Sequence, residues 1–447
     1  MTTPLPDPPL ATTGIRRYLR IGGLLLAFVA VDAVGVAVVF DFFGLLWLGV
    51  VVALIAFAIA AFGFREGTSE KLRTGALALL ILLLLFLPQV LLIVAQPPNA
   101  PIIDGALLND VAADRLLSGH DPYVGDFLNT PMRAFYLSDV PVNFGLSRFV
   151  YMPGMALLDV PLRLLHSDRA NFSWLFLPAL LALAAAAWSI GRSTAGKQAA
   201  VVVVTLNPLF QLDYFYLLND LFFLAPALAG VGMLRRGRPL AAGALLGLSI
   251  GMKQQAILFL PLLALYALRH LERRDLLRLA GAGTLVVGVI VLPFLAWDPK
   301  AFLAGTAGFF YGSGVDSYPI RGLGLQGILL RVGVIGNRWD SFPSAQIQVP
   351  LLVIALVLAV RDLRRSWWWG RYWAWLGLEA LIVFAFGRVL SPNYLDLVVT
   401  FLLLAVASAL VGESPGLAVE RDVEGTSGGS GPIGTVAEHD PGHLPAL

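Results

Sequence analysis

The chain has 447 residues, of which 58% are hydrophobic and 13% are charged, and its formal net charge is +2. Its mean hydropathy of +0.79 excludes an ordinary water-soluble domain. The absence of cysteine excludes disulfides and thiolate metal sites, and the scattered histidines predict no metal centre. Since the net charge is close to zero, no nucleic-acid partner is expected, and no cofactor motif is visible.

The apolar residues come in blocks of about 20, the length at which an α-helix crosses the ~30 Å hydrocarbon core of a bilayer. The first block follows a Pro-rich and then basic N-terminal segment, 1–20, which lacks a signal-peptide cleavage site. These blocks predict an all-α, polytopic transmembrane bundle with about ten full crossings, together with re-entrant or half helices. The predicted crossings are 21–40, 43–63, 74–96, 171–191, 199–217, 220–234, 276–297, 347–360, 372–387 and 393–411.

Six clusters of Lys and Arg separate these blocks, and the positive-inside rule predicts that all six are cytoplasmic. The stretches 97–149 and 298–346 then become two large loops on the outer face. The Gly-, Pro- and Ser-rich tail, 412–447, has no apolar period and is expected to be a disordered cytoplasmic segment. The clusters begin at Arg16, Arg65, Arg192, Arg235, Arg269 and Arg361.

Two apolar stretches do not fit a simple crossing. The run 149–165 is short and is interrupted by Pro153 and Pro161, so it is predicted to be a re-entrant or interfacial helix. The run 240–268 has basic clusters at both ends and Lys253 in its middle, which predicts two half-helices that meet at a polar tip. A lysine inside an apolar stretch is costly and favours a functional role.

The first outer loop is acidic. A helix is predicted from about 105 to 118, with Asp110 and Asp114 four residues apart on one side. A carboxylate at this boundary is suited to act as a general base on a hydroxyl group, and Asp104 and Asp110 are the candidates. The alternative is that these aspartates only solvate a surface loop.

Other polar residues are expected at the same outer face. Aromatic residues at such turns also occur as interfacial belts, and an arginine there can extend its side chain to water for structural reasons alone. The candidates for donor or acceptor binding are Tyr151, Asn219, Asp220, Lys253, Arg388 and Tyr394.

The order of several short motifs resembles the GT-C superfamily of membrane glycosyltransferases. These motifs are an LLxGxxPY-like element ending at Tyr123, a Tyr-x-Pro segment at Tyr151, a GLxxGxKQ-like stretch ending at Gln254, and a Ser-Pro-x-Tyr turn at Tyr394. Within the superfamily, the pattern is similar to the polyprenyl-phosphate-mannose-dependent mannosyltransferases of actinobacteria. The resemblance covers 74–411 and leaves two additional helices in 21–73.

The resemblance implies a multi-pass enzyme of a bacterial plasma membrane, with its active face outside the cytoplasm. It would transfer a sugar, with mannose as the first candidate, from a polyprenyl-phosphate donor to a glycolipid or polysaccharide acceptor, with inversion. An aspartate of the first loop, Asp104 or Asp110, would be the base. Tyr123 and Gln254 join the substrate-binding candidates, and Lys253, Arg321 or Arg388 would neutralise the phosphate.

Two alternatives remain at this stage. Ionisable residues within the apolar spans, Asp32, Lys253 and Glu379, are also compatible with a lipid or polysaccharide transporter. The second alternative is a non-catalytic membrane protein that keeps the fold. A transferase is expected to concentrate its essential residues at the outer face, whereas a transporter needs them along a path through the bundle.

Overall fold

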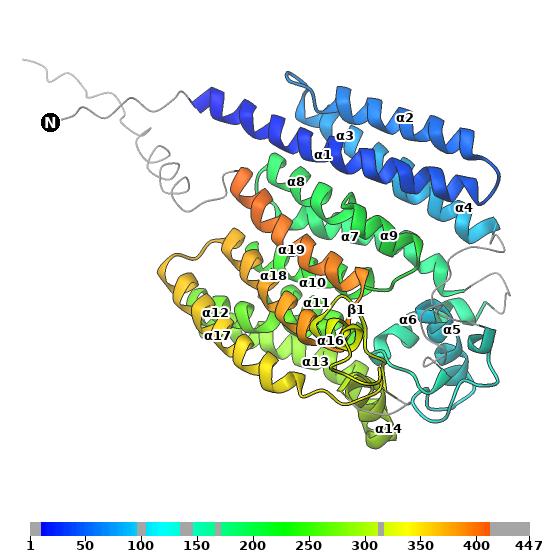
Figure 1. Ribbon diagram of the computed structural model, residues 1–447. Helices are drawn as coiled ribbons and strands as arrows, with labels where there is room; N and C mark the ends of the chain where they lie inside the picture. The colour runs from blue at the N-terminus through cyan, green and yellow to red at the C-terminus, as the bar shows by residue number, and fades with distance from the viewer. Residues whose placement is uncertain (1–9, 96–103, 135–145, 166–170, 312–316, 412–447) are drawn as a thin grey trace, which may run out of the picture.

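The structure is a computed structural model that describes residues 10–95, 104–134, 146–165, 171–311 and 317–411. These residues form a bundle of helices, with α5, α6, α14, α16 and β1 gathered at one end (Figure 1). The predicted disordered tail, 412–447, lies outside the described residues. The predicted all-α polytopic fold is confirmed.

The N-terminal half begins with four helices or helix segments and continues through the first long loop. The elements up to residue 215 are α1 (Leu10–Asp41), α2 (Leu46–Gly63), α3 (Glu70–Ile81), η1 (Leu82–Phe86), α4 (Leu87–Ala95), α5 (Asp104–Leu117), η2 (Pro131–Ala134), α6 (Pro153–Arg163), η4 (Phe172–Leu175), α7 (Phe176–Ile190), α8 (Thr194–Thr205) and α9 (Pro208–Phe215).

The C-terminal half contains the remaining helices and a minimal parallel pair, β1 with β2. The elements are α10 (Leu221–Arg235), α11 (Pro239–Met252), η5 (Gln254–Phe259), α12 (Leu260–His270), α13 (Arg273–Trp297), α14 (Pro299–Leu303), η6 (Ala304–Gly308), α15 (Phe309–Tyr311), β1 (Arg321–Gly322), α16 (Leu325–Arg331), α17 (Ser344–Arg365), α18 (Trp369–Phe386), β2 (Val389–Leu390) and α19 (Pro392–Leu410).

Seven helical segments of the described chain are long and apolar enough to cross a membrane: Ile21–Asp41, Leu46–Gly63, Glu70–Ala95, Phe172–Ile190, Arg273–Trp297, Ser344–Arg365 and Pro392–Leu410. The other three predicted crossings correspond to α8 with α9, to α10 and to α18. Of these, α8, α9 and α10 are shorter, whereas α18 carries Arg371 and Glu379.

The predicted crossing 199–217 is broken at Asn207, which separates α8 from α9. The Asn207 side chain caps α9 by accepting from the backbone N–H of Leu209 at 3.1 Å, and Pro208 occupies the first helical turn. Its amide nitrogen donates to Asp396 at 2.6 Å and to Thr400 at 3.1 Å, both on α19. Hydropathy depends on composition and does not detect helix caps, so the sequence predicted the two helices as one crossing.

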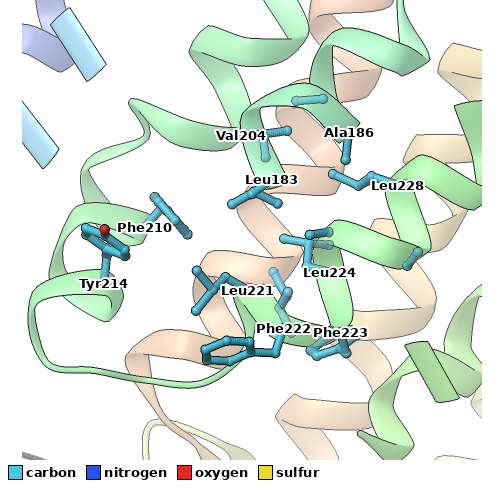
Figure 2. Packing of buried hydrophobic residues seen from close by; sticks show 14 of the residues in the cluster. Leu183, Ala186, Val204, Phe210, Tyr214, Leu221, Phe222, Phe223, Leu224 and Leu228 are labelled. Atoms are coloured by element: carbon cyan, nitrogen blue, oxygen red, sulfur yellow. The ribbon is translucent and has the colours of Figure 1, made fainter. Parts of the chain in front are cut away.

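The core between α7, α8, α9 and α10 is densely apolar (Figure 2). Phe222 lies with its ring 4.9 Å from that of Phe172 and 5.0 Å from that of Phe176, in tilted and edge arrangements. This packing holds the first turn of α10 in place. The residue just before that turn is Asp220, one of the predicted site residues.

Glycines set the register between α11 and α13. A Cβ at Gly243 would overlap with the carbonyl oxygen of Leu279, and one at Gly247 would lie 2.5 Å from that of Gly283. From the first contact to the second, the residue numbers increase by four on both helices, so α11 and α13 run parallel. Gly251 reaches Ile290 in the same register. At 1.5 Å per residue, α11 therefore ends about 10 Å before the C-terminal end of α13.

The predicted half-helix pair is confirmed. The break occurs at Lys253, whose φ of −154° and ψ of 136° place it in an extended conformation between α11 and η5. Because α11 and α13 are parallel, α12 must return toward the start of α13, and the turn at Lys253 lies toward the C-terminal end of α13. The predicted short helix in 149–165 is α6, with 11 residues.

We expect Gly243→Ala to cost about 1–3 kcal/mol of unfolding free energy, because the added methyl group meets backbone atoms that cannot rotate away. Gly281→Ala on α13 is the matched control, since nothing lies within 4 Å of the place that a Cβ would occupy there. The measurement is a dodecyl sulfate unfolding titration. Equal stability of the two variants would contradict the close parallel packing.

Candidate active site

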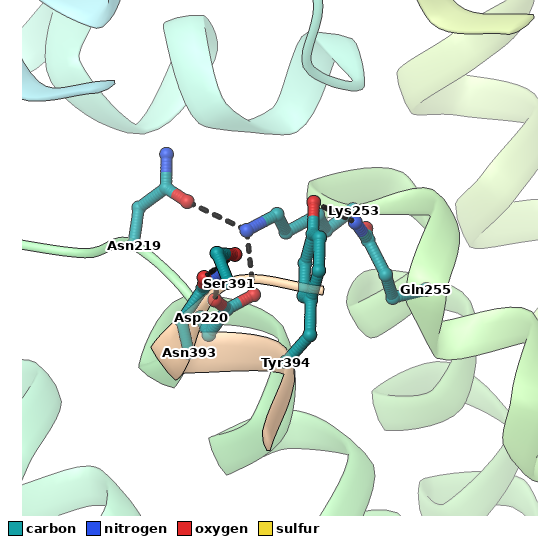
Figure 3. A network of polar contacts seen from close by, with 7 residues as sticks. All are labelled: Asn219, Asp220, Lys253, Gln255, Ser391, Asn393 and Tyr394. Atoms are coloured by element: carbon teal, nitrogen blue, oxygen red, sulfur yellow. Dashed lines mark hydrogen bonds and ion pairs between the residues drawn. The ribbon is translucent and has the colours of Figure 1, made fainter. Parts of the chain in front are cut away.

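Lys253 is the centre of a buried polar network (Figure 3). Its ammonium group donates to Asn219 Oδ1 at 2.8 Å and to Asp220 Oδ1 at 2.5 Å. The other oxygen of Asp220 accepts from Asn393 Nδ2 at 2.5 Å, and Asn393 in turn accepts from the hydroxyl of Ser391. Lys253 is only 4% exposed and Asp220 5%, so the charge of each is compensated mainly by the other.

The N-termini of two α-helices and the start of a 3-10 helix meet in this network. Asp220 precedes α10, Lys253 precedes η5, and Ser391 precedes α19. The N-terminus of an α-helix carries a partial positive charge and unpaired N–H groups, which favour an anion. The predicted convergence of Asn219, Asp220 and Lys253 is therefore present in the structure, and its electrostatics suit a negatively charged group.

Two hydrogen-bond donors of the network have no partner among the described residues. The Nδ2 group of Asn219 is buried without an acceptor, although the side chain is only 3% exposed. An ammonium group has three donors, and the described residues account for two of those of Lys253. Because buried donors are rarely left unpaired, these two are suited to a bound anion.

The N-terminus of α5 lies against the same network. A Cβ at Gly105 would lie 2.9 Å from the Tyr151 hydroxyl and 3.2 Å from Asn219 Nδ2. The backbone of Asp104, the first residue of α5, is therefore next to the unpaired donor of Asn219. The predicted helix 105–118 matches α5, which begins one residue earlier and ends one earlier.

Aromatic residues enclose one side of the network. Lys253 Nζ lies 5.6 Å from the ring centroid of Tyr151 and 6.0 Å from that of Phe223, within the range of cation–π attraction. Tyr123 donates its hydroxyl to the backbone oxygen of Tyr151 at 2.7 Å, and its ring packs edge-on against Phe149. Tyr123 therefore holds the Tyr151 segment, and it is itself 4% exposed.

Gln255 and Tyr394 form a second polar contact beside Lys253, visible in Figure 3. Gln255 Nε2 donates to the Tyr394 hydroxyl at 3.3 Å, and the Tyr394 ring stacks on Phe384 with centroids 4.4 Å apart. The Oε1 atom of the neighbouring Gln254 is buried without a partner among the described residues. These side chains extend the polar surface from the network toward α18 and α19.

Arg388 lies in the turn between α18 and β2, where it contacts backbone carbonyl groups of the loop 298–346. It donates to the backbone oxygens of Tyr318 at 2.7 Å, Asp340 at 3.1 Å and Arg338 at 3.2 Å, and it is 9% exposed. Arg321 belongs to the parallel pair, in which it faces Val389. The contacts of Arg388 hold this loop together, and among the described residues neither arginine is a hydrogen-bond partner of Lys253 or Asp220.

We expect Arg388→Met to lower the free energy of unfolding by about 2 kcal/mol or more, because three carbonyl groups lose their donor. Limited trypsin digestion should also cut the loop faster. Arg331→Met, at the exposed last residue of α16, is the control and should change neither quantity measurably. Equal protection of the loop in both variants would show that Arg388 does not hold it.

Asp110 lies in a different cluster, about a third of a turn around α5 from Asp104. Its Oδ1 accepts from the backbone N–H of Phe172 at 2.8 Å, and its carboxyl group contacts that of Asp159 on α6. Burial, followed by the charge of Asp110, raises the pKa of Asp159 to about 8. Burial also raises the pKa of Asp110, against the opposing effect of the Phe172 N–H.

Several residues of these clusters were not selected from the sequence as site residues. Asn393 and Ser391 complete the charge compensation around Lys253, and both lie in the Ser-Pro-x-Tyr turn that the sequence placed beside the other polar residues, although neither was chosen as a binding residue. Asp159 is an aspartate inside a short apolar helix and is fully buried. A buried carboxyl in such a helix requires a partner, which is a signal that the sequence does contain.

The comparisons with known proteins fit this arrangement. No curated protein and no solved structure matches the chain significantly. The model of glycosyltransferase family 87 matches residues 149–392, which is more than half of the chain and includes Tyr151, Asn219, Asp220 and Lys253. The chain therefore belongs to glycosyltransferase family 87, a family of GT-C-type membrane glycosyltransferases.

Proposed function

We propose that this membrane glycosyltransferase transfers a sugar, with mannose the first candidate, from a polyprenyl-phosphate donor to a glycolipid or polysaccharide acceptor. The reaction takes place at the outer face of a bacterial plasma membrane. The observation that supports this proposal is the buried Asn219 Nδ2, which has no acceptor among the described residues, beside the buried Lys253 ammonium and the N-termini of α10 and α19. A phosphate group satisfies both donors and the helix ends.

A lipid-linked donor suits the depth of the site. Lys253 lies about 10 Å before the outer end of α13, near the level at which lipid headgroups meet the hydrocarbon core. The phosphate of a polyprenyl phosphate lies at this level while its chain stays in the membrane. The proposal needs no nucleotide-binding motif, and the sequence contains none.

We assign the role of base to Asp104. The acceptor hydroxyl attacks the anomeric carbon from the face opposite the phosphate, and its proton passes to the Asp104 carboxylate. A new bond forms between the anomeric carbon and the acceptor oxygen while the bond to the phosphate oxygen breaks, so the configuration inverts. Lys253 and Asn219 stabilise the charge on the departing polyprenyl phosphate. Asp110 is less suited, because its carboxyl is already bonded to Phe172 and Asp159.

Tyr151, Gln254 and Tyr394 are the remaining candidates for sugar contacts. The Tyr151 ring lies over the Lys253 ammonium, and the Oε1 atom of Gln254 can accept from a sugar hydroxyl. Asp220 holds Lys253 in place through the ion pair. We do not assign Arg321, Arg388 or Tyr123 a direct substrate contact, since Arg388 and Tyr123 are bonded to backbone carbonyl groups and Arg321 lies in the strand pair.

The test uses purified protein in lipid nanodiscs with radiolabelled polyprenyl-phosphate mannose and a membrane lipid extract as acceptor. We expect label to move into a glycolipid with the opposite anomeric configuration. Parallel reactions with polyprenyl-phosphate glucose and arabinose identify the sugar. Transfer from a nucleotide sugar but from none of the polyprenyl-phosphate donors would overturn the proposed donor class.

A further inference from the structure

Two side-chain contacts join α5 to α6, one helical turn apart. Asp110 on α5 contacts Asp159 on α6, and four residues later Asp114 pairs with Arg163. The second contact is a bidentate ion pair, with both N–O distances at 2.8 Å. Because each step is one helical turn on both helices, α5 and α6 run parallel and in register.

This register places the two helix starts at the same level. Asp104 precedes Asp110 by six residues, and Pro153 precedes Asp159 by six residues. Both helices therefore begin about 9 Å from the Asp110–Asp159 contact. Both starts also lie against the Lys253 network, through Gly105 beside Asn219 and through Gly154 beside the end of α11. These two contacts between α5 and α6 thus fix the backbone positions of Asp104 and Tyr151 relative to that network.

The Asp110–Asp159 contact requires a proton. Asp159 is fully buried, and no N–H or O–H donor of the described residues reaches either of its oxygens. Two carboxylates repel each other, whereas a carboxyl and a carboxylate form a short hydrogen bond. The charged or titratable groups that face the pair are Asp114 and Arg163, together with the Phe172 N–H from η4.

We propose that the Asp110–Asp159 pair is a proton-dependent latch, which holds α5 on α6 and thereby positions Asp104 at the site. The inference rests on the proposed function only for its activity readout. Both aspartates are positioning residues, since neither touches the Lys253 network. The ion pair of Asp114 with Arg163 is partly exposed and contributes less to the closure.

The direction of the pH effect follows from linkage. The carboxyl of Asp159 has an ordinary pKa near 3.8 when α5 separates from α6, and about 8 in the closed pair. Closure takes up a proton, so its stabilisation is complete at acidic pH and decreases as pH rises. The stabilisation of the closed pair is lost completely once the pH exceeds the pKa of Asp159 in that pair. The latch is therefore expected to be closed at about pH 6 and loosened at about pH 9.

The absence of cysteine allows a direct structural test. Spin labels are attached to Leu117→Cys on α5 and Leu157→Cys on α6, at side chains that are 41% and 40% exposed. We expect a narrow distance distribution at about pH 6 and a broad one at about pH 9. In Asp159→Asn, the amide donates to the Asp110 carboxylate without titrating, so the distribution should stay narrow at both values.

The activity assay gives an independent readout. We expect the transfer rate of the wild type to fall about tenfold between about pH 7 and about pH 9, and Asp159→Asn to remove most of that fall. The latch is overturned if the label distances in the wild type do not change with pH, or if Asp159→Asn broadens as the wild type does. Absent transfer with a normal distance response would count against the proposed function and leave the latch in place.

Discussion

Asp104→Asn is expected to lower kcat for sugar transfer by about a thousandfold, because the acceptor hydroxyl loses the group that takes its proton. The donor KM should change little, since the phosphate contacts of Lys253 and Asn219 remain. Single-turnover assays with saturating polyprenyl-phosphate donor measure the loss directly.

The variant Asp110→Asn tests which of the two aspartates, Asp104 or Asp110, acts as the base. The amide oxygen can still accept from Phe172 and the amide nitrogen can donate to Asp159, so the structure predicts a loss of only a few fold. Asp41→Asn, at the exposed last residue of α1, is the matched control and should behave as the wild type. A thousandfold loss in Asp110→Asn with retained activity in Asp104→Asn would transfer the role of base to Asp110.

Lys253→Met is expected to cost about 3–5 kcal/mol of unfolding free energy, because it leaves the buried Asp220 carboxylate without its compensating charge. It should also abolish measurable donor binding. The double variant Lys253→Met with Asp220→Asn removes both charges, and it should recover most of the stability but none of the donor affinity.

The stability of these variants is measured by dodecyl sulfate titration, and donor affinity by equilibrium binding of labelled polyprenyl-phosphate sugar. Lys300→Met is the control, since Lys300 is an exposed lysine at the same end of the molecule. Equal destabilisation in the single and double variants would show that the two charges are not coupled. Recovered donor affinity in the double variant would show that the ammonium group does not hold the phosphate.

The proposed base and the proposed phosphate site are controlled by separate parts of the chain. Asp104 is carried by α5, which precedes the segment that matches the family, whereas Asn219 and Lys253 lie within it. The approach of α5 to the network depends on Gly105, because a Cβ there would contact both Tyr151 and Asn219. Variation in the first outer loop can therefore alter the base and the acceptor without disturbing the phosphate contacts.

The all-α membrane fold could be predicted from the sequence, since blocks of about 20 apolar residues can be stabilised in a bilayer only as helices. The break at Lys253 could also be predicted, because a charged side chain in the middle of an apolar run requires a polar partner. Asn219 and Asp220 were expected to be near it on the basis of the alternating inside and outside ends of successive helices. These inferences depend on local composition and on the order of segments along the chain.

Tertiary structure alone decided how the individual side chains are used. Asp104 and Asp110 were equivalent in the sequence, but the fold brings the Asp110 carboxyl to the Phe172 N–H and to Asp159, whereas the side chain of Asp104 lies outside the described part of the chain. Arg388 had the charge of a phosphate ligand, yet the folding of the second outer loop surrounds it with backbone carbonyl groups. Hydropathy and charge determine where a segment lies relative to the membrane, whereas hydrogen bonds between residues distant in the chain determine which polar groups remain available for a substrate.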